Sequence, residues 1–368
     1  MIFQINKDTL KKGVSKLKNT LAKDSPRPIT KHFLFEVKDK TLTMKSTNNS
    51  VSSVWTTKVD SEDSFAFTIP GDTFTSLIST LEHDVVTFDY STATKDVKVT
   101  CGKYTWDASS GDVTEFPNIT VPEDLEEVIL PTEFQNLLRS VSFSISNDVT
   151  KMDLSSLCVD INRDKEGQVN LLSTDRIRLS CASFNLVLAS KNHIRFLIPR
   201  ASLSEVIKFE PTKMSFDKDL RKVYFTQEDP TGTYTFQTVL ANTVYPDIYT
   251  YLNRDFSKES ELIQIQKQDL LRALKRTIIT SDKNIGRFTF NRGNLSIATL
   301  NEINTSKSKE FLEINYNLDN EITFSLNVNH LIDYLSQETL DVISFRIVGG
   351  KCLVFDKANY RHVLSVNP

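Results

Sequence analysis

The sequence predicts an α+β protein built of three tandem domains, each of which is a duplicated β-α-β-β-β unit. Two observations predict this architecture. A segment of twelve residues that has the pattern of a strand running into a helix occurs three times, and a second strand-helix segment opens each third of the chain. The 368 residues then divide into domains of about 120 residues, which is an ordinary domain size.

The first repeated segment occupies residues 67–78, 196–207 and 324–335. Each copy begins with alternating apolar residues, which is typical of a half-buried strand, and continues with an i, i+3, i+4 apolar stripe, which is typical of a helix. In the first two copies Pro70 and Pro199 lie where the helix can begin, since a proline in the first turn loses no hydrogen bond. Chance matches are the alternative, but three aligned segments at nearly equal intervals make chance a poor explanation.

The second repeated segment gives each third another helix, and strand-like runs follow both helices. The apolar stripes of these helices are Leu10/Val14/Leu17, Phe134/Leu138/Val141 and Leu270/Leu274/Ile278. In the first third the expected strands are residues 32–37, 41–45, 51–59, 85–90, 97–101 and 104–108. Acidic, polar stretches at 122–127 and 253–259 place the domain boundaries, so we expect domains at 1–124, 125–254 and 255–368.

The composition of the chain limits where the protein can be located and what kind of surface can bind a partner. The net charge is −3, so a surface that binds nucleic acid must be local. The four cysteines show no C-x-x-C spacing and are expected to be reduced thiols of a cytoplasmic protein. No segment has the pattern of a signal peptide or approaches the roughly 18 apolar residues of a membrane span, so no membrane partner is expected.

Three short motifs carry a resemblance to a known family. Residues 171–180, Leu-Leu-Ser-Thr-Asp-Arg-Ile-Arg-Leu-Ser, resemble the second-domain signature of the bacterial β sliding clamp, the β subunit of DNA polymerase III. Residues 245–249, Tyr-Pro-Asp-Ile-Tyr, resemble the Phe-Pro-Asp-Tyr of the same family. Glu115-Phe116-Pro117, at the end of the first domain, shows a weaker resemblance to the same motif. The chain resembles this family over almost its whole length.

The resemblance implies a fold and a function. The three domains would be clamp domains, and two chains would join head to tail into a homodimeric ring around double-stranded DNA. Such a ring is a processivity factor rather than an enzyme: it holds a polymerase on DNA, and it binds the polymerase and the clamp loader through short linear peptides. The helices would line the central hole and the sheets would form the outer rim.

A sliding ring must attract phosphates without reading bases, so basic residues on the helices are the candidates for DNA contact. The alternative is that these residues are simply the solvated face of amphipathic helices. The cluster on the first helix favours DNA, because Asp8 is its only acid. The candidates are Lys7, Lys11, Lys12, Lys16, Lys18, Arg139, Lys151, Arg200, Lys267, Arg272, Lys275 and Arg276.

The resemblance also implies a peptide cleft between the second and third domains. An apolar floor is expected from Leu154, Leu179, Pro246, Leu364 and Val366, with Arg178 supplying charge and hydrogen bonds at the rim. The alternative for the apolar members is ordinary core packing. The full set carried over is Leu154, Thr174, Arg176, Ile177, Arg178, Leu179, Pro246, Thr250, Tyr251, Val363, Leu364 and Val366.

The chain departs from the family pattern inside this cleft. Arg176 stands where the family usually has Gly, Ile177 where it has His or Tyr, and Thr250 where it often has Arg. The C-terminus reads Leu-Ser-Val-Asn-Pro where the family commonly has Met-Pro-Met-Arg-Leu. These departures put the peptide preference in doubt.

The sequence gives little support to an enzymatic function. The five histidines form no metal-binding motif, and no nucleophile elbow, Walker loop or dinucleotide fingerprint occurs, so neither a metal nor a cofactor is expected. Asp175 and Asp247 read as turn anchors rather than catalytic acids. Two alternatives to the clamp remain: an interaction adaptor that does not close a ring on DNA, and, more distantly, a nuclease or other enzyme on the same fold.

Overall fold

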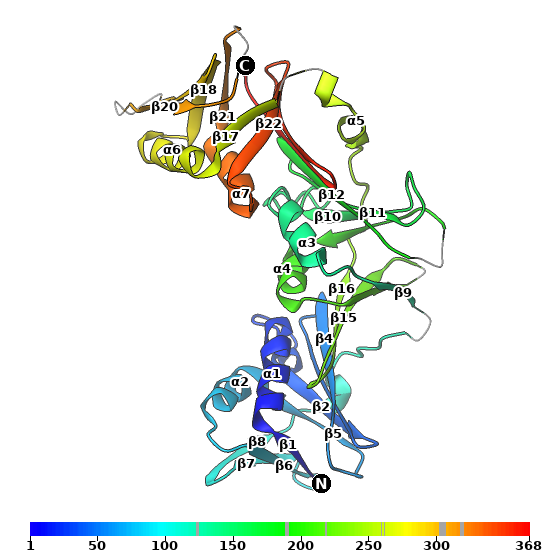
Figure 1. Cartoon of the computed structure of the whole chain (residues 1–368). Helices are drawn as coiled ribbons and strands as arrows, with labels where there is room; N and C mark the ends of the chain where they lie inside the picture. Colours follow the sequence, from blue (N-terminus) through cyan, green and yellow to red (C-terminus); the bar gives the residue numbers. More distant parts are fainter. Residues whose placement is uncertain are drawn as a thin grey trace. The chain divides into compact units, whose positions relative to one another are not determined.

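The computed structural model describes residues 1–122, 125–187, 191–217, 219–258, 260, 262–301, 307–316 and 320–368 (Figure 1). Each third of the chain follows the predicted order of strand, helix and three strands, twice over. Glu123, Asp124 and Glu259, which belong to the expected boundary stretches, lie outside the described residues.

The elements agree with the predicted ranges to within one or two residues. The first third contains β1 (Ile2–Asn6), α1 (Lys7–Leu17), β2 (His32–Lys38), β3 (Thr41–Thr47), β4 (Val51–Lys58), β5 (Phe65–Pro70), α2 (Gly71–Thr80), β6 (Val85–Ser91), β7 (Asp96–Cys101) and β8 (Tyr104–Ser109). The second contains β9 (Glu126–Ile129), α3 (Phe134–Ser142), β10 (Ser156–Ile161), β11 (Gln168–Thr174), β12 (Arg178–Asn185), β13 (Ile194–Pro199), α4 (Arg200–Phe209), β14 (Lys213–Phe216), β15 (Lys222–Asp229) and β16 (Gly232–Val239). After the short helix α5 (Tyr249–Leu252), the third contains β17 (Leu262–Gln266), α6 (Lys267–Thr280), β18 (Ile285–Asn291), β19 (Asn294–Thr299), β20 (Lys309–Glu313), β21 (Ile322–Asn327), α7 (Val328–Gln337), β22 (Val342–Val348), β23 (Cys352–Lys357) and β24 (Tyr360–Ser365).

The two prolines lie one position earlier than expected. Pro70 is the N-cap residue of α2, and Pro199 is the last residue of β13, directly before α4 begins at Arg200. Both still occupy positions at which the missing backbone N–H breaks no helical hydrogen bond, so the physical reason for the prediction holds.

The strands form antiparallel sheets, and two of these sheets join strands from successive thirds of the chain. The chain has two compact units, 1–132 with 201–240, and 133–200 with 241–368. The first unit holds the sheets β1-β6-β7-β8 and β5-β2-β3-β4-β16-β15-β14-β9. The second holds β13-β10-β11-β12-β24-β23-β22-β17 and β20-β19-β18-β21. The units divide the middle third between them, and the domain boundaries at 124 and 254 stay a prediction.

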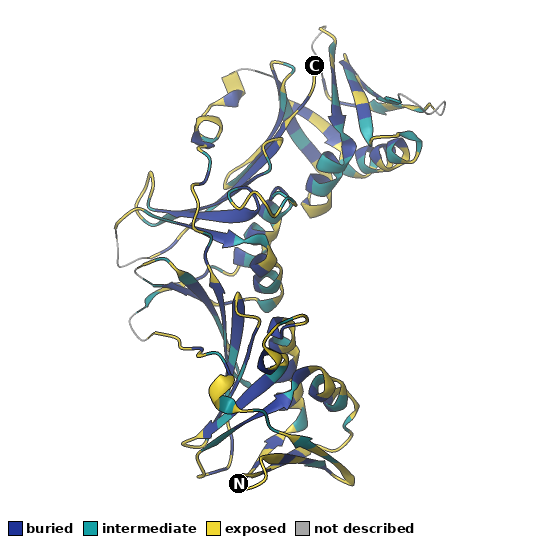
Figure 2. Cartoon of the chain, turned by 180° about the vertical axis from the view of Figure 1, so that it is seen from behind, coloured by how far each residue is buried: buried dark blue, intermediate teal, exposed yellow. Residues whose placement is uncertain are grey.

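Helices cover one face of the sheets within each unit, and the core lies between them. In the first unit, rings from both of its sheets meet under α1 and α2: Phe3 stacks on Phe88 at 4.7 Å between ring centroids, and Phe35 stacks on Phe67 at 4.9 Å. In the second unit, α6 and α7 cover a core that includes Phe288, Phe290 and Phe324. Figure 2 shows the central strands largely buried, with exposed residues along the helices.

Helix α1 is fixed to the joint between β4 and β16. Trp55 of β4 is fully buried, lies opposite Tyr234 of β16 in the register, and stacks on it at 5.9 Å. Gly13 of α1 lies over Trp55, so that a Cβ at this position would be 2.4 Å from ring atoms of the indole. Only a glycine therefore lets the helix that carries the predicted lysine cluster approach the sheet so closely.

Replacing Gly13 with alanine should destabilise the first unit. The rigid indole cannot yield to the added methyl group, so the overpacking should lower the free energy of unfolding by about 1–3 kcal/mol, although alanine favours helix by roughly 1 kcal/mol. Urea unfolding followed by tryptophan fluorescence measures the change. The exposed Ser15→Ala on the same helix is the control, and equal stability of the two variants would contradict the close packing.

Candidate partner-binding pocket and basic helices

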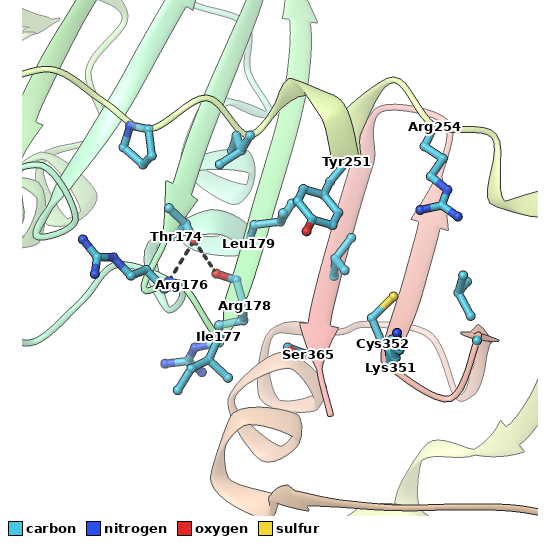
Figure 3. A pocket seen from close by; sticks show the side chains of 15 residues that line it. Thr174, Arg176, Ile177, Arg178, Leu179, Tyr251, Arg254, Lys351, Cys352 and Ser365 are labelled. Atoms are coloured by element: carbon cyan, nitrogen blue, oxygen red, sulfur yellow. Dashed lines mark hydrogen bonds between the residues drawn. The ribbon is translucent and has the colours of Figure 1, made fainter. Parts of the chain in front are cut away.

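A cavity of about 780 Å³ lies within the second unit (Figure 3). It is formed by the β11–β12 turn, by β24 with the adjoining β22–β23 turn, and by the segment around α5. The lining residues are Thr174, Arg176, Ile177, Arg178, Leu179, Pro246, Ile248, Tyr251, Arg254, Val348, Gly349, Lys351, Cys352, Val363 and Ser365.

The apolar floor comes from the pairing of β12 with β24. Leu179 and Val363 face each other in the antiparallel register, and both belong to one buried cluster with Ile248 and Val348. Antiparallel neighbours on one face have Cβ atoms only about 5 Å apart, so the two side chains make one continuous surface. The structure thus brings together eight of the expected cleft residues: Thr174, Arg176, Ile177, Arg178, Leu179, Pro246, Tyr251 and Val363.

Four expected residues do not line the cavity. Leu364 and Val366 are buried in the core under α6 and α7, because successive side chains of a strand point to opposite faces and Val363 occupies the cavity side. Leu154 is fully buried and lies in the segment just before β10. Thr250 is exposed on α5 and is not among the lining residues. The expected floor therefore needs correction: it is built from Leu179, Pro246 and Val363.

Hydrogen bonds of two side chains shape the β11–β12 turn. The Oδ1 atom of Asp175 accepts the backbone N–H groups of Ile177 and Arg178 at 3.0 and 2.9 Å. The hydroxyl of Thr174 accepts the N–H of Arg176 at 3.1 Å and donates to the carbonyl oxygen of Arg178 at 2.8 Å, as drawn in Figure 3. The interpretation of Asp175 as a turn anchor is confirmed. The turn holds Arg176 at a φ of +78°.

Arg178 is a structural ion-pair partner rather than a free charge at the rim. Its guanidinium is buried and donates to Asp175 at 2.8 Å and to Asp333 of α7 at 2.6 Å. Two carboxylates on one buried guanidinium neutralise its charge and fix its orientation. The expectation that Arg178 supplies charge to a peptide at the rim needs correction.

The wall around α5 is attached to the sheet by a buried carboxylate. Asp247 accepts the backbone N–H of Tyr249 at 3.1 Å, which confirms its interpretation as a turn anchor. The hydroxyl of Tyr249 donates to Asp160 of β10 at 2.7 Å, and burial with this hydrogen bond raises the pKa of Tyr249. Asp160 is fully buried and also binds Arg195 and His193, at 2.5 and 2.6 Å.

A buried histidine lies on the other side of the β12–β24 joint. His362 is fully buried; its Nδ1 lies 2.8 Å from the hydroxyl of Ser180, and its ring stacks on Tyr334 at 5.1 Å. Burial, with a smaller contribution from the Arg178 charge, lowers the pKa of His362 to about 3. The imidazole is therefore neutral in the folded chain at physiological pH.

The buried imidazole should make the second unit acid-sensitive. The unfolded chain, whose histidine has the ordinary pKa of 6.5, binds a proton that the folded chain excludes. Stability is therefore complete above about pH 6.5 and falls below it, by roughly 2 kcal/mol on reaching about pH 5. Urea unfolding at several pH values should show a shallower loss for His362→Phe, with exposed His83→Phe as the control. An unchanged pH slope in His362→Phe would remove the buried imidazole as the cause.

Four of the predicted DNA-contacting cations are exposed without a partner. Within the described ranges, the side chains of Lys11 and Lys12 on α1, Lys18 just after it, and Lys275 on α6 form no hydrogen bond or ion pair. Asp8 remains the only acid in α1. Arg139 is exposed on α3.

The other predicted cations have partners within the chain. Lys16 is half-buried, with its amine 3.1 Å from Asp229 and 3.6 Å from the centre of the Tyr234 ring, so it holds α1 to the sheet instead of facing a ligand. Exposed ion pairs contribute little to stability. The ion pairs of Lys151, Arg272 and Arg276 therefore do not exclude a contact of these side chains with phosphate. Three of the others donate to backbone carbonyl oxygens: Lys7 to Glu82, Arg200 to Ile145 and Lys267 to Glu338. The last three pair with carboxylates: Lys151 with Asp148, Arg272 with Asp269 and Arg276 with Glu310.

Seven lining residues were not anticipated. Ser365 could have been found, because it lies two positions after Val363 on the same strand face. The others come from the β22–β23 turn and from the segment around α5, where no local motif marks them. They join the cavity only through the pairing of β23 with β24 and the attachment of α5. The seven are Ile248, Arg254, Val348, Gly349, Lys351, Cys352 and Ser365.

Two negative observations concern the described parts of the chain. No group of three or more His, Cys, Asp or Glu side chains there could hold a metal ion. No helix there is long and apolar enough to cross a membrane.

Sequence comparison places the chain in one class of protein. The domain models of the DNA polymerase III beta subunit match residues 1–120 as its N-terminal domain and 128–247 as its central domain, together more than half of the chain. A chain of repeated β-α-β-β-β units that matches these domain models is a sliding clamp.

Relatives and solved structures agree over nearly the full length. The chain is 23% identical to the beta sliding clamp of Haemophilus influenzae, covering 91% of this chain and 90% of the relative. The DNA polymerase III subunit beta of Pseudomonas aeruginosa superposes with a TM-score of 0.89 at 18% identity, covering 100% and 99% of the two chains. A Helicobacter pylori beta clamp bound to a DNA ligase peptide superposes with a TM-score of 0.85 at 17% identity, covering all of both chains.

The chain belongs to the bacterial β sliding clamp family, the β subunits of DNA polymerase III. Members of this family are processivity factors and not enzymes.

Proposed function

We propose that two copies of this chain close head to tail into a ring around duplex DNA and tether a polymerase to it. The observation that carries this proposal is the way in which the sheets join one domain to the next. In each internal joint, the last of the three strands after a domain's first helix pairs with the last strand of the next domain: β4 with β16, and β12 with β24.

Two strands at the corresponding positions are not paired in this way within the described chain. β20 is the counterpart of β4 and β12, and β8 is the counterpart of β16 and β24, and each lies at the end of its own sheet. Both carry exposed aromatic side chains, Phe311 on β20 and Tyr104 on β8. A second copy that pairs its β8 with β20 would repeat the internal joint and leave neither edge open, which is a heterologous contact that closes. In this proposal each chain contributes three clamp domains to the ring, at 1–124, 125–254 and 255–368.

The first test is the mass in solution. Light scattering across a dilution series should give twice the chain mass of 41.9 kDa, and Phe311→Asp should return it to the single-chain value, because a desolvated carboxylate in a strand joint is costly. Ile129→Asp is the matched control, since Ile129 is an equally exposed aliphatic residue on β9, an edge outside the proposed joint. A chain that is monomeric at every concentration, or a dimer broken by the control instead, would overturn the β8–β20 joint.

The ring would hold DNA through charges that do not read sequence. Lys11, Lys12, Lys18 and Lys275 support this role because they are exposed, unpaired within the described residues and carried on helices rather than on strands. Lysines of this kind bind phosphates through counterion release, which any sequence permits.

Reversing two of these charges should shorten retention on DNA. Lys11→Glu with Lys12→Glu should lower the lifetime of the loaded ring on circular duplex DNA by about tenfold at low salt, because two attractive contacts become repulsive, while the mass stays dimeric. Lys38→Glu with Lys58→Glu, at the ends of β2 and β4, is the matched control. Retention that is unchanged in the first pair, or equally reduced in both, would remove α1 from the DNA-facing surface.

The pocket is the proposed attachment point for partners. Its apolar floor of Leu179, Val363 and Pro246 suits the apolar residues of a linear peptide, and the Helicobacter pylori clamp was crystallised with a DNA ligase peptide. We expect the polymerase and the clamp loader to bind here in a cytoplasmic replisome. An adaptor that never closes on DNA would keep the pocket's peptide binding but would show no retention on circular DNA.

A further inference from the structure

The mouth of the pocket carries positive charge that nothing in the described chain neutralises. Arg176 and Lys351 both line the cavity and are exposed, and neither side chain forms a hydrogen bond or ion pair in the described residues. None of the described lining residues is an aspartate or glutamate. Arg178, by contrast, is already neutralised by Asp175 and Asp333. The floor is therefore apolar and the mouth is cationic.

The backbone at Arg176 is unfavourable for an arginine. The turn hydrogen bonds of Thr174 and Asp175 hold this residue in the left-handed region, at a φ of +78°. This region is unfavourable for a residue with a Cβ, because the Cβ approaches the neighbouring carbonyl oxygen, whereas glycine adopts it without strain. The guanidinium forms no hydrogen bond or ion pair inside the described chain, so these interactions do not account for an arginine at this turn.

We propose that the pocket selects linear peptides in which acidic side chains flank the apolar anchor. This inference rests on the proposed role of the pocket as a peptide site. Figure 3 places Arg176 on the β11–β12 side and Lys351 across the cavity from it, with the apolar floor between them. A carboxylate on either side of a buried leucine or phenylalanine reaches one cation each, and Arg176 can bind its carboxylate through two parallel hydrogen bonds.

The test uses two synthetic peptides of about nine residues that share a central Leu-Phe. One carries two aspartates on each side of this centre, and the other carries asparagines at the same positions. Fluorescence anisotropy with the full-length chain should show the aspartate peptide binding about fivefold more tightly at low salt, with the preference disappearing at about 0.5 M salt. Both peptides should slow alkylation of Cys352, the half-buried lining thiol; the other three cysteines are buried.

Arg176→Gly should abolish most of the aspartate preference, so that the ratio of the two peptide affinities falls from about fivefold toward one. The variant should fold at least as well as the parent, because glycine accepts the positive φ. Lys95→Gly is the matched control, since Lys95 is another exposed cation at a positive φ, +58°, in the turn between β6 and β7.

The outcomes separate this inference from the proposed function. Equal binding of the two peptides would overturn acidic selection and leave the peptide pocket standing. A preference that survives in Arg176→Gly, or is lost equally in Lys95→Gly, would overturn the role of Arg176. If neither peptide binds or protects Cys352, both acidic selection and peptide binding at this pocket are overturned.

Discussion

The pairing of strand edges between successive thirds of the chain is the constraint on which the rest of the structure depends. An isolated four-stranded repeat would expose backbone N–H and C=O groups along its edge, which is both unstable and prone to aggregation. Pairing β12 with β24 removes two such edges at once. The same pairing sets Leu179 opposite Val363 and so builds the pocket floor from two strands that are far apart in sequence. The binding site is thus a consequence of how the repeats are joined.

Repetition explains why so much of the fold could be predicted from sequence. Strand and helix periods are local signals, and three copies of each pattern confirm one another where a single copy would be ambiguous. The face of a strand is a harder question. In β24 the apolar residues Val363 and Leu364 are adjacent, so the pattern does not say which one faces the pocket, and a shift of one residue exchanges the faces. For this reason the sequence predicts Leu364 and Val366 in the floor, whereas in the structure Val363 lines the cavity and those two residues belong to the core.

Charges were harder to place than apolar residues, because their partners are distant in sequence. Lys16 is matched with Asp229, 213 residues away, and Arg178 with Asp333, 155 residues away. No helical pattern or local motif reveals such pairs. Counting lysines on a predicted helix face therefore overstates the charge available to DNA, and only the folded chain separates Lys11 and Lys12 from Lys16 on the same helix.

Arg176 and Arg178 show how one turn gives two similar residues different roles. The aspartate between β11 and β12 bonds the backbone N–H of Arg178 and its guanidinium together, which draws that side chain inward toward Asp333. The geometry that makes this possible leaves Arg176 with a positive φ and an outward side chain at the cavity mouth. The inner arginine is held by two acids, and the outer one is held by none in the described chain. A carboxylate supplied by a partner is the missing counterpart, so the turn that rigidifies the pocket also sets the charge that its ligand must carry.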